Sequence, residues 1–315
     1  MLFSLVMLFS GCVAAEPMPD AAERETMRRA IFTVPFDPEL EPCGTAMDVT
    51  LASLVYQLDT LAAETPGEVY GLAATSYGTV LWQRNPHAAA TPASVMKLLT
   101  GLATLDVLGP DYPITLGEPH DSSLAAYAGA VIDWENPLPL TEALRFTLLY
   151  SVNNYADILL THLGPAYGLS ATIAGGTEAL TLWLDAHGLL IDDPVLLDGS
   201  GLSPGNRISP TLVVNLIRWA MADRHDAIRE LLTYLPLSGV SGTLTGRFAA
   251  EPDAVLRVRA KTGTLPGVSA LAGVTPQQQA GVWTVFAVFI NDAPVGSGVR
   301  QAYLDAMVGA MVCLT

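Results

Sequence analysis

Residues 91–109 read TPASVMKLLTGLATLDVLG, and the spacing of the apolar residues predicts a helix over 91–105. Thr91 is a favourable N-cap for this helix. Pro92 fits its first position, where the missing N–H costs nothing. The start of the helix is therefore well marked in the sequence.

This predicted helix carries Ser94 and Lys97 in its first turns, in the pattern S-x-x-K. The i, i+3 spacing places the hydroxyl and the amine on one face, within reach of each other. The residues around Lys97 are apolar, and burial lowers the pKa of a lysine. A neutral lysine can take the proton of a serine, which then becomes a nucleophile. Alone, the pattern is weak, because any helix can carry it on a solvated face.

Two further short motifs follow. Ser151-Val-Asn153 comes at the predicted head of another apolar helix, where Ser and Asn are also typical of an ordinary N-cap. The run 261–264, Lys-Thr-Gly-Thr, ends a predicted strand over Val255–Ala260, where a glycine lets a ligand backbone approach closely. An ordinary hairpin turn with an exposed lysine has the same pattern.

S-x-x-K, then S-x-N, then K-T-G resembles the signature of class A β-lactamases and penicillin-binding proteins. Longer segments are similar to one branch, the class C low-molecular-mass penicillin-binding proteins, which are D-alanyl-D-alanine carboxypeptidases and endopeptidases. The resemblance covers roughly residues 67–292. The similar segments are 91–109, LLYSVNNYADILL (148–160), LLDGSGLSPGNRISP (196–210), LPLSGVSGTLTGRF (235–248) and RAKTGTLPGVSALAG (259–273).

The resemblance implies acyl transfer to a serine. Ser94 would attack the carbonyl of a terminal D-Ala-D-Ala bond, with Lys97 as the general base. Ser151 would relay a proton to the leaving amine with the help of Lys261. Asn153 would hold the substrate amide.

The resemblance also implies how a stem peptide of peptidoglycan would bind. Thr262 and Lys261 would bind its terminal carboxylate, beside Gly263. The N–H groups of Ser94 and Thr264 would form the oxyanion hole. β-Lactam antibiotics would be covalent inhibitors. No cofactor or metal is implied, and the five histidines show no H-E-x-x-H spacing.

The order of the predicted helices and strands along the chain predicts a mixed α/β (α+β) protein. One antiparallel sheet is made from both ends of the chain, flanked by helices, with an all-helical lobe inserted. We expect an α/β lobe from 46–90 and 250–315, and a helical lobe over about 91–249. The predicted flanking elements are a helix at 47–61, strands at 69–75, 79–83, 268–274 and 282–290, and a closing helix at 298–312.

The composition excludes several classes of protein. Among 315 residues, 31 are acidic and 15 basic, which gives a net charge of −16. This balance argues against a nucleic-acid partner, because phosphate binding needs clustered Lys and Arg. Half of the residues are apolar, which excludes disorder for most of the chain. Of the basic residues 13 are arginines and only two are lysines, Lys97 and Lys261, and both lie in the motifs.

The N-terminus resembles an export signal. An apolar run over 1–9 is followed by small residues, although no Lys or Arg precedes it. Three interpretations of this segment stay open: cleavage after residue 15, a bacterial lipoprotein signal with a lipid on Cys12, or a buried N-terminal helix. Residues 16–45 contain five prolines and read as a tether. We therefore expect a periplasmic or other extracytoplasmic protein.

In an exported protein, the two other cysteines, Cys43 and Cys313, predict a disulfide, with two free thiols as the alternative.

Class C proteins commonly carry large extra domains between the first two motifs, whereas Ser94 and Ser151 are only 57 positions apart here. The shortening leaves endopeptidase action open. A β-lactamase is the nearest alternative, but the first glutamate after Asn153, Glu178, lacks the Glu-x-x-Leu-Asn setting of class A enzymes. A non-catalytic wall-binding or antibiotic-sensing domain is the other alternative. The oligomeric state stays open.

Overall fold

A computed structural model describes residues 50–119, 134–222, 226–279, 281–312 and 314. Its centre is a five-stranded sheet in the order β2-β1-β7-β6-β5, in which every neighbouring pair is antiparallel. The predicted sheet from both chain ends is therefore confirmed. The strands are β1 (Glu68–Thr75), β2 (Val80–Arg84), β5 (Arg259–Leu265), β6 (Val268–Pro276) and β7 (Trp283–Asn291).

The central strand β7 is buried on both faces, which explains its continuous apolar sequence. Alternate residues of a strand point to opposite faces. Val285, Ala287 and Phe289 belong to one core cluster, and Phe286 and Val288 belong to the other. The sheet thus separates two hydrophobic cores.

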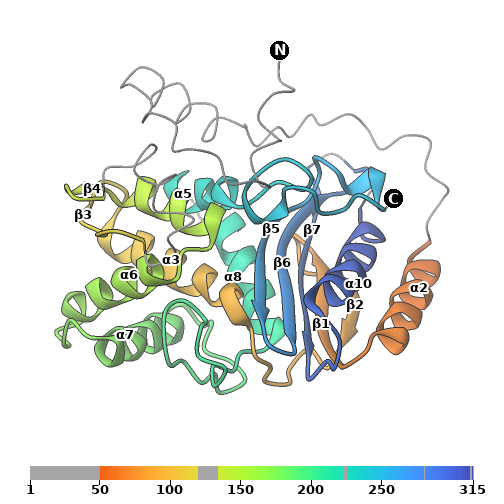
Figure 1. Ribbon diagram of the computed structural model, residues 1–315, viewed down its shortest axis with the longest axis horizontal. Coiled ribbons are helices and arrows are strands. Elements are labelled where there is room, and N and C mark those ends of the chain that lie inside the picture. Colours follow the sequence, from red (N-terminus) through yellow and green to blue (C-terminus); the bar gives the residue numbers. More distant parts are fainter. Residues whose placement is uncertain (1–49, 120–133, 223–225, 280, 313, 315) are drawn as a thin grey trace, which may run out of the picture.

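Helices cover both faces (Figure 1). Helices α2 (Leu51–Glu64) and α10 (Ser297–Gly309) contribute to one core, and α8 (Pro210–Ala222) packs against β1, β6 and β7 from the other side. Beside the sheet lies a group of helices that contact one another. They are α3 (Met96–Leu108), α5 (Leu140–Tyr150), α6 (Asn153–Ala166), α7 (Ile173–Ala186) and α9 (Asp226–Glu230). The exact boundaries of the two lobes stay a prediction.

Short elements connect these parts. They are the two-stranded pair β3 (Pro113–Ile114) and β4 (Leu138–Pro139), and the 3₁₀ turns η1 (Ala93–Val95), η2 (Leu231–Tyr234), η3 (Gly242–Leu244) and η4 (Pro252–Ala254). Within the described residues, no helix is both long and apolar enough to cross a membrane.

The strand predicted over Val255–Ala260 is wrong, because β5 begins only at Arg259. Leu256 has a φ of 67°, which a strand does not accommodate. Its N–H donates to the carbonyl of Ser238, which holds the chain in a turn. The K-T-G motif consequently lies inside the strand instead of after it.

The N-cap predicted for the first motif helix is also wrong. Thr91 makes no capping hydrogen bond, and the helix is entered through η1, with Pro92 before it. The hydroxyl of Thr91 instead accepts a hydrogen bond from Arg207, at 2.8 Å. The first described helix begins at Leu51 with Thr50 as its N-cap, which is later than the predicted start at residue 47.

The export signal over 1–15, the tether over 16–45 and the cysteines Cys12, Cys43 and Cys313 lie outside the described residues.

Candidate active site

The turn that carries Ser94 has an unusual backbone. Ala93 is fully buried and has a φ of 45°, a left-handed conformation that is rare for a residue other than glycine. Two glycines touch this turn. A Cβ on Gly201 would lie 1.9 Å from the carbonyl oxygen of Ala93, and a Cβ on Gly263 would lie 3.1 Å from the nitrogen of Ser94. Only glycine lets both neighbouring segments come so close to the turn.

Asn291, at the end of β7, fixes the chain just before this turn. Its Oδ1 accepts the N–H of Thr91 at 2.8 Å, and its Nδ2 donates to the carbonyl of Thr91 at 3.2 Å. A side-chain amide thus takes the place of a backbone partner, and it ties the start of the turn to the sheet.

Lys97 lies in the first turn of α3 and is 1% exposed. Its Nζ is 2.7 Å from Ser94 Oγ, 2.8 Å from Asn153 Oδ1 and 2.7 Å from the carbonyl oxygen of Ser200. Burial lowers the pKa of Lys97 to about 7, although Asp157 and Asp198 act in the opposite direction. A large share of Lys97 is therefore neutral near pH 7, and it touches the Ser94 hydroxyl in that form.

The S-x-N motif lies where one helix ends and the next begins, so it stands at the head of a helix as predicted, although the N-cap is Val152 and neither Ser151 nor Asn153. Ser151 is the C-cap of α5 and has a φ of 62°, and α6 begins at Asn153. This left-handed residue turns the chain so that Asn153 reaches the first motif and Ser151 reaches the third. Ser151 Oγ lies 2.8 Å from Lys261 Nζ, and Asn153 Oδ1 contacts Lys97.

Lys261 lies on β5 and is completely buried. Its Nζ also donates to the carbonyl of Thr262, at 2.9 Å. Burial lowers the pKa of Lys261 well below its ordinary value, and the nearby charge of Lys97 lowers it further. The two lysines of the chain thus lie in one site, and their repulsion favours a neutral form.

Strand β5 is the last strand in the sheet order, and it lies against η1. Thr262 and Thr264 are more exposed than Lys261 and Gly263, as strand alternation requires. An edge strand offers backbone N–H and C=O groups to an extended peptide. This edge lies beside Ser94, so a peptide paired with it would run past the hydroxyl.

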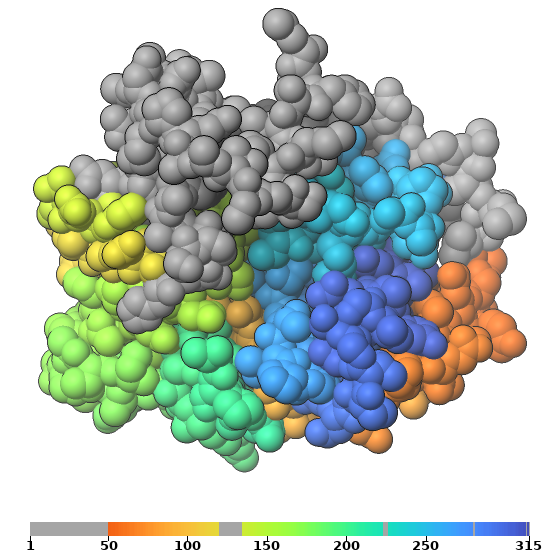
Figure 2. All heavy atoms as spheres, in the orientation of Figure 1, coloured from red at the N-terminus to blue at the C-terminus, as the bar shows by residue number. Residues whose placement is uncertain are grey.

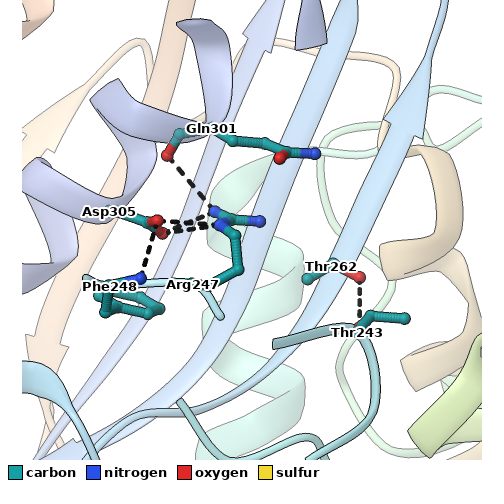
Figure 3. Close-up of polar contacts among 6 residues, drawn as sticks. All are labelled: Thr243, Arg247, Phe248, Thr262, Gln301 and Asp305. Atoms are coloured by element: carbon teal, nitrogen blue, oxygen red, sulfur yellow. Dashed lines mark hydrogen bonds and ion pairs between the residues drawn. The ribbon is translucent and has the colours of Figure 1, made fainter. Parts of the chain in front are cut away.

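Thr262 Oγ1 lies 2.7 Å from the Oγ1 of Thr243, which belongs to η3. Figure 3 shows this contact. Thr243, Ser200, Asp157 and Asp198 are residues of the site that sequence reasoning missed. The run Asp-Gly-Ser-Gly, which starts at Asp198, is typical of tight turns. It was the feature of the sequence that pointed to this part of the site. Ser200 itself contacts Lys97 through a backbone atom, which no residue pattern reveals.

Glu178, the glutamate weighed for a β-lactamase, is exposed on α7. Across the part of the chain that the structure describes, no group of three or more His, Cys, Asp or Glu side chains is arranged to hold a metal ion.

Comparison with known proteins identifies relatives of this chain. It is 32% identical over 186 residues to carboxypeptidase DacB of Mycolicibacterium smegmatis, covering 58% of this chain and 40% of that protein. It is 33% identical over 166 residues to a D-alanyl-D-alanine carboxypeptidase of Actinomadura sp., covering 47% and 29% respectively. The chain therefore spans less than half of the length of these curated relatives.

Solved structures share the fold. Penicillin-binding protein 4 (dacB) from Haemophilus influenzae has a TM-score of 0.68 at 17% identity, covering 82% of this chain and 99% of that chain. A class A β-lactamase from Bacteroides cellulosilyticus has a TM-score of 0.63 at 19% identity, covering 82% and 96%. The model of one peptidase family matches residues 54–117 and 126–312. The resemblance inferred from the motifs is thus confirmed, and the chain belongs to the D-Ala-D-Ala carboxypeptidase 3 (S13) family.

Proposed function

We propose that the protein is a serine DD-peptidase that cleaves the terminal D-Ala-D-Ala bond of peptidoglycan stem peptides through an acyl-enzyme on Ser94. The observation that carries the proposal is the contact between Ser94 Oγ and a buried Lys97, whose pKa is lowered to about 7. A base is most effective when its pKa lies near the working pH.

In the acylation step, Ser94 Oγ attacks the carbonyl carbon between the two D-Ala residues while its proton passes to Lys97 Nζ. The N–H groups of Ser94 and Thr264 stabilise the oxyanion that forms. The C–N bond then breaks, and the proton that Lys97 took from Ser94 is passed through the hydroxyl of Ser151, beside Lys261, to the departing amine of the last D-Ala. Water releases the acyl group from Ser94.

Substrate binding uses the edge of β5 beyond Ala260, where the pairing with the segment at Leu237 ends. Lys261 and Thr262 bind the terminal carboxylate, and Gly263 keeps the strand close to the Ser94 turn. The Oδ1 of Asn153 is engaged by Lys97, so its amide N–H₂ is the group that donates to the substrate.

The same site takes β-lactams as covalent inhibitors. The structure of the Haemophilus influenzae protein, which shares the fold, holds a β-lactam, and a relative from Dictyostelium discoideum is named a penicillin-sensitive carboxypeptidase. The proposed substrate, a peptidoglycan stem peptide, lies in the cell wall. The present protein therefore acts outside the cytoplasm, either after signal cleavage or anchored by a lipid on Cys12. A Cys43–Cys313 disulfide would then close nearly the whole domain.

The test combines penicillin acylation with D-Ala release. We expect a long-lived penicillin adduct on Ser94 by mass spectrometry and release of D-Ala from a pentapeptide. Both should be lost in Ser94→Ala and kept in Ser53→Ala, a control on an exposed position of α2.

Other results would contradict the proposal. Rapid turnover of penicillin would identify a β-lactamase. A stable adduct without D-Ala release would identify a non-catalytic binding domain.

A further inference from the structure

The nitrogen of Lys97 has contacts that restrict how its hydrogens can point. Asn153 Oδ1 and the carbonyl oxygen of Ser200 are acceptors only, at 2.8 and 2.7 Å. A neutral amine has two N–H groups and one lone pair. When both N–H groups donate to these oxygens, the lone pair is left for the third contact, the hydroxyl of Ser94 at 2.7 Å. The two carbonyl oxygens thus orient the base.

The Ser200 carbonyl is presented by a turn that closes around one carboxylate. Asp198 Oδ1 accepts the N–H of Gly201 at 2.6 Å and the side-chain amide of Asn206 at 2.9 Å. Asp198 Oδ2 accepts the N–H of Ser203 at 2.6 Å. Hydrogen bonds to an ionised carboxylate are stronger than those between neutral groups. Asp198 therefore fixes the turn on the C-terminal side of Ser200.

Other contacts fix the turn at Gly199, on the N-terminal side of Ser200. Asp157 Oδ1, on α6, accepts the N–H of Gly199 at 3.0 Å, and the Thr100 hydroxyl donates to the carbonyl of Gly199 at 2.8 Å. Gly201 has a φ of 78° and lies against Ala93. The peptide that contacts Lys97 is thus held between two carboxylates and the Ser94 turn.

We propose that Asp198 is a positioning residue for acylation: it sets the turn whose Ser200 carbonyl, together with Asn153, directs the lone pair of Lys97 at the Ser94 hydroxyl. During attack, the Ser94 proton moves along this contact to Lys97 as the bond from Oγ to the carbonyl carbon forms. The inference rests on the proposed function, because it requires Ser94 to be acylated.

Asp198 also acts through its charge. Three charged or titratable groups face Lys97: Asp157 from α6, Asp198 from the loop and Lys261 from β5. The two aspartates raise the pKa of Lys97 and oppose the effect of burial. Burial raises the pKa of Asp157, and the charge of Asp198 raises it further. Removing the charge of Asp198 should therefore lower the pKa of Lys97 below about 7.

The experiment measures the rate constant for acylation by penicillin from pH 5 to 9 in the full chain and in three variants. We expect Asp198→Ala to be about 10- to 100-fold slower, since small misplacements of a catalytic group have effects of this size. Asp198→Asn keeps one acceptor oxygen and loses the charge. Its rate should fall less, and the acidic limb of its pH profile should move to lower pH.

Asp192→Asn is the matched control. Asp192 accepts a hydrogen bond from the Ser209 hydroxyl at 2.7 Å and contacts His87, so it anchors a neighbouring part of the same loop without facing Lys97. The acidic limb of the pH profile of Asp192→Asn should stay at the wild-type position. Each rate is normalised to the fraction of the protein that penicillin can label. Unfolded protein in a variant preparation then does not lower the measured rate.

Two results would overturn the inference while the proposed function stands. One is a wild-type rate and profile in both Asp198 variants. The other is a slower Asp198→Asn whose acidic limb does not move, which would assign Asp198 a purely structural role. Absence of both acylation and D-Ala release in the wild type would instead contradict the proposed function, and the inference with it.

Discussion

The side-chain nitrogen of Lys261 lies 2.8 Å from the hydroxyl oxygen of Ser151, although the two residues are 110 positions apart in the chain. Lys261 is fully buried, and its pKa is lowered well below the ordinary value, chiefly by burial and then by Lys97. A neutral lysine in this position can exchange a proton with the serine hydroxyl. The contact thus joins the second and third motifs, and under the proposed function it would form part of a proton path.

This contact predicts that Lys261→Arg inactivates the protein. Arginine stays protonated and is larger, so it cannot share a proton with Ser151 and places a fixed charge near Lys97. We expect acylation by penicillin to fall at least about 100-fold, the usual contribution of a proton-transfer group. Arg84→Lys, on β2, is the control and should keep the wild-type rate. Retention of more than half of the rate in Lys261→Arg would contradict the proton path.

The pKa of about 7 at Lys97 predicts the pH dependence of acylation. Only neutral Lys97 can take the Ser94 proton, so the rate should reach a plateau above pH 7 and fall about tenfold per pH unit below it. Stopped-flow labelling with a fluorescent penicillin measures this profile. A rate that stays flat from pH 5 to 8 would exclude Lys97 as the base.

Burial of Lys97 also predicts a pH-dependent stability. Its pKa is about 7 in the folded protein and 10.5 without the fold, so between these values the unfolded chain binds more protons. The contribution of Lys97 is therefore unfavourable at low pH, and this penalty is relieved as pH rises. The free energy of unfolding of the wild type should rise relative to Lys97→Met by about 1 kcal/mol per pH unit from pH 7 to 10. Urea unfolding of both proteins at three pH values tests this, and parallel curves would contradict it.

The contact between Gly263 and the Ser94 turn predicts that Gly263→Ala is damaging. The added Cβ would lie 2.7 Å from the carbonyl oxygen of Pro92 and 3.1 Å from the nitrogen of Ser94. We expect a loss of about 1–3 kcal/mol in the free energy of unfolding and slower acylation, because β5 must move away from the turn. Gly298→Ala is the control, since a Cβ there meets open space in the first turn of α10 and should stabilise the protein by about 0.5–1 kcal/mol. Equal melting temperatures for the two variants would refute the argument.

Arg247 and Asp305 hold the segment that carries Thr243 (Figure 3). Asp305, on α10, accepts three hydrogen bonds from the Arg247 guanidinium and one from the N–H of Phe248. The side chains of Arg247 and Asp305 are each 13% exposed. Asp305→Ala should destabilise the protein by about 3 kcal/mol, because a largely buried guanidinium loses its partner.

The same variant should raise the KM for a pentapeptide, since Thr243 contacts Thr262 at the edge of β5. Asp226→Ala is the control. Asp226 forms an exposed pair with Arg229, and its loss should cost less than about 0.5 kcal/mol. Chemical unfolding and steady-state kinetics on both variants decide the question, and equal effects would show that the Arg247 contact is unimportant.

Local patterns predicted much of the fold. Strands β1, β2, β6 and β7 and helix α10 lie close to their predicted positions. In each of them the spacing of the apolar residues follows the face that is buried. Strand β5 was predicted about four residues too early. The turn before it is held by Ser238, whose hydroxyl accepts the N–H of Val258 from 20 positions away. A single-sequence pattern contains no such contact.

In Figure 2 the yellow and green part of the chain, which holds the helical group, lies beside the blue part, which holds β5 to β7. The site draws Ser94 and Lys97 from the first part and Lys261 from the second. The turn that carries Ser94 is tied to the sheet by Asn291, 200 positions from Thr91, which bonds both the backbone N–H and the carbonyl of Thr91. The cap was predicted from local chemistry alone, whereas the hydroxyl of Thr91 accepts a hydrogen bond from Arg207, 116 positions away.

The sequence by itself determined the order of the three motifs, the pairing of Ser94 with Lys97 and the family, because these depend on residue types and on spacing within one helix turn. The tertiary structure alone decided that Ser151 meets Lys261 and that the Ser200 carbonyl, 103 positions from Lys97, accepts a hydrogen bond from its Nζ. Contacts across such separations form only when the sheet and the helices pack. They also use backbone atoms and burial, which the identity of a residue does not encode.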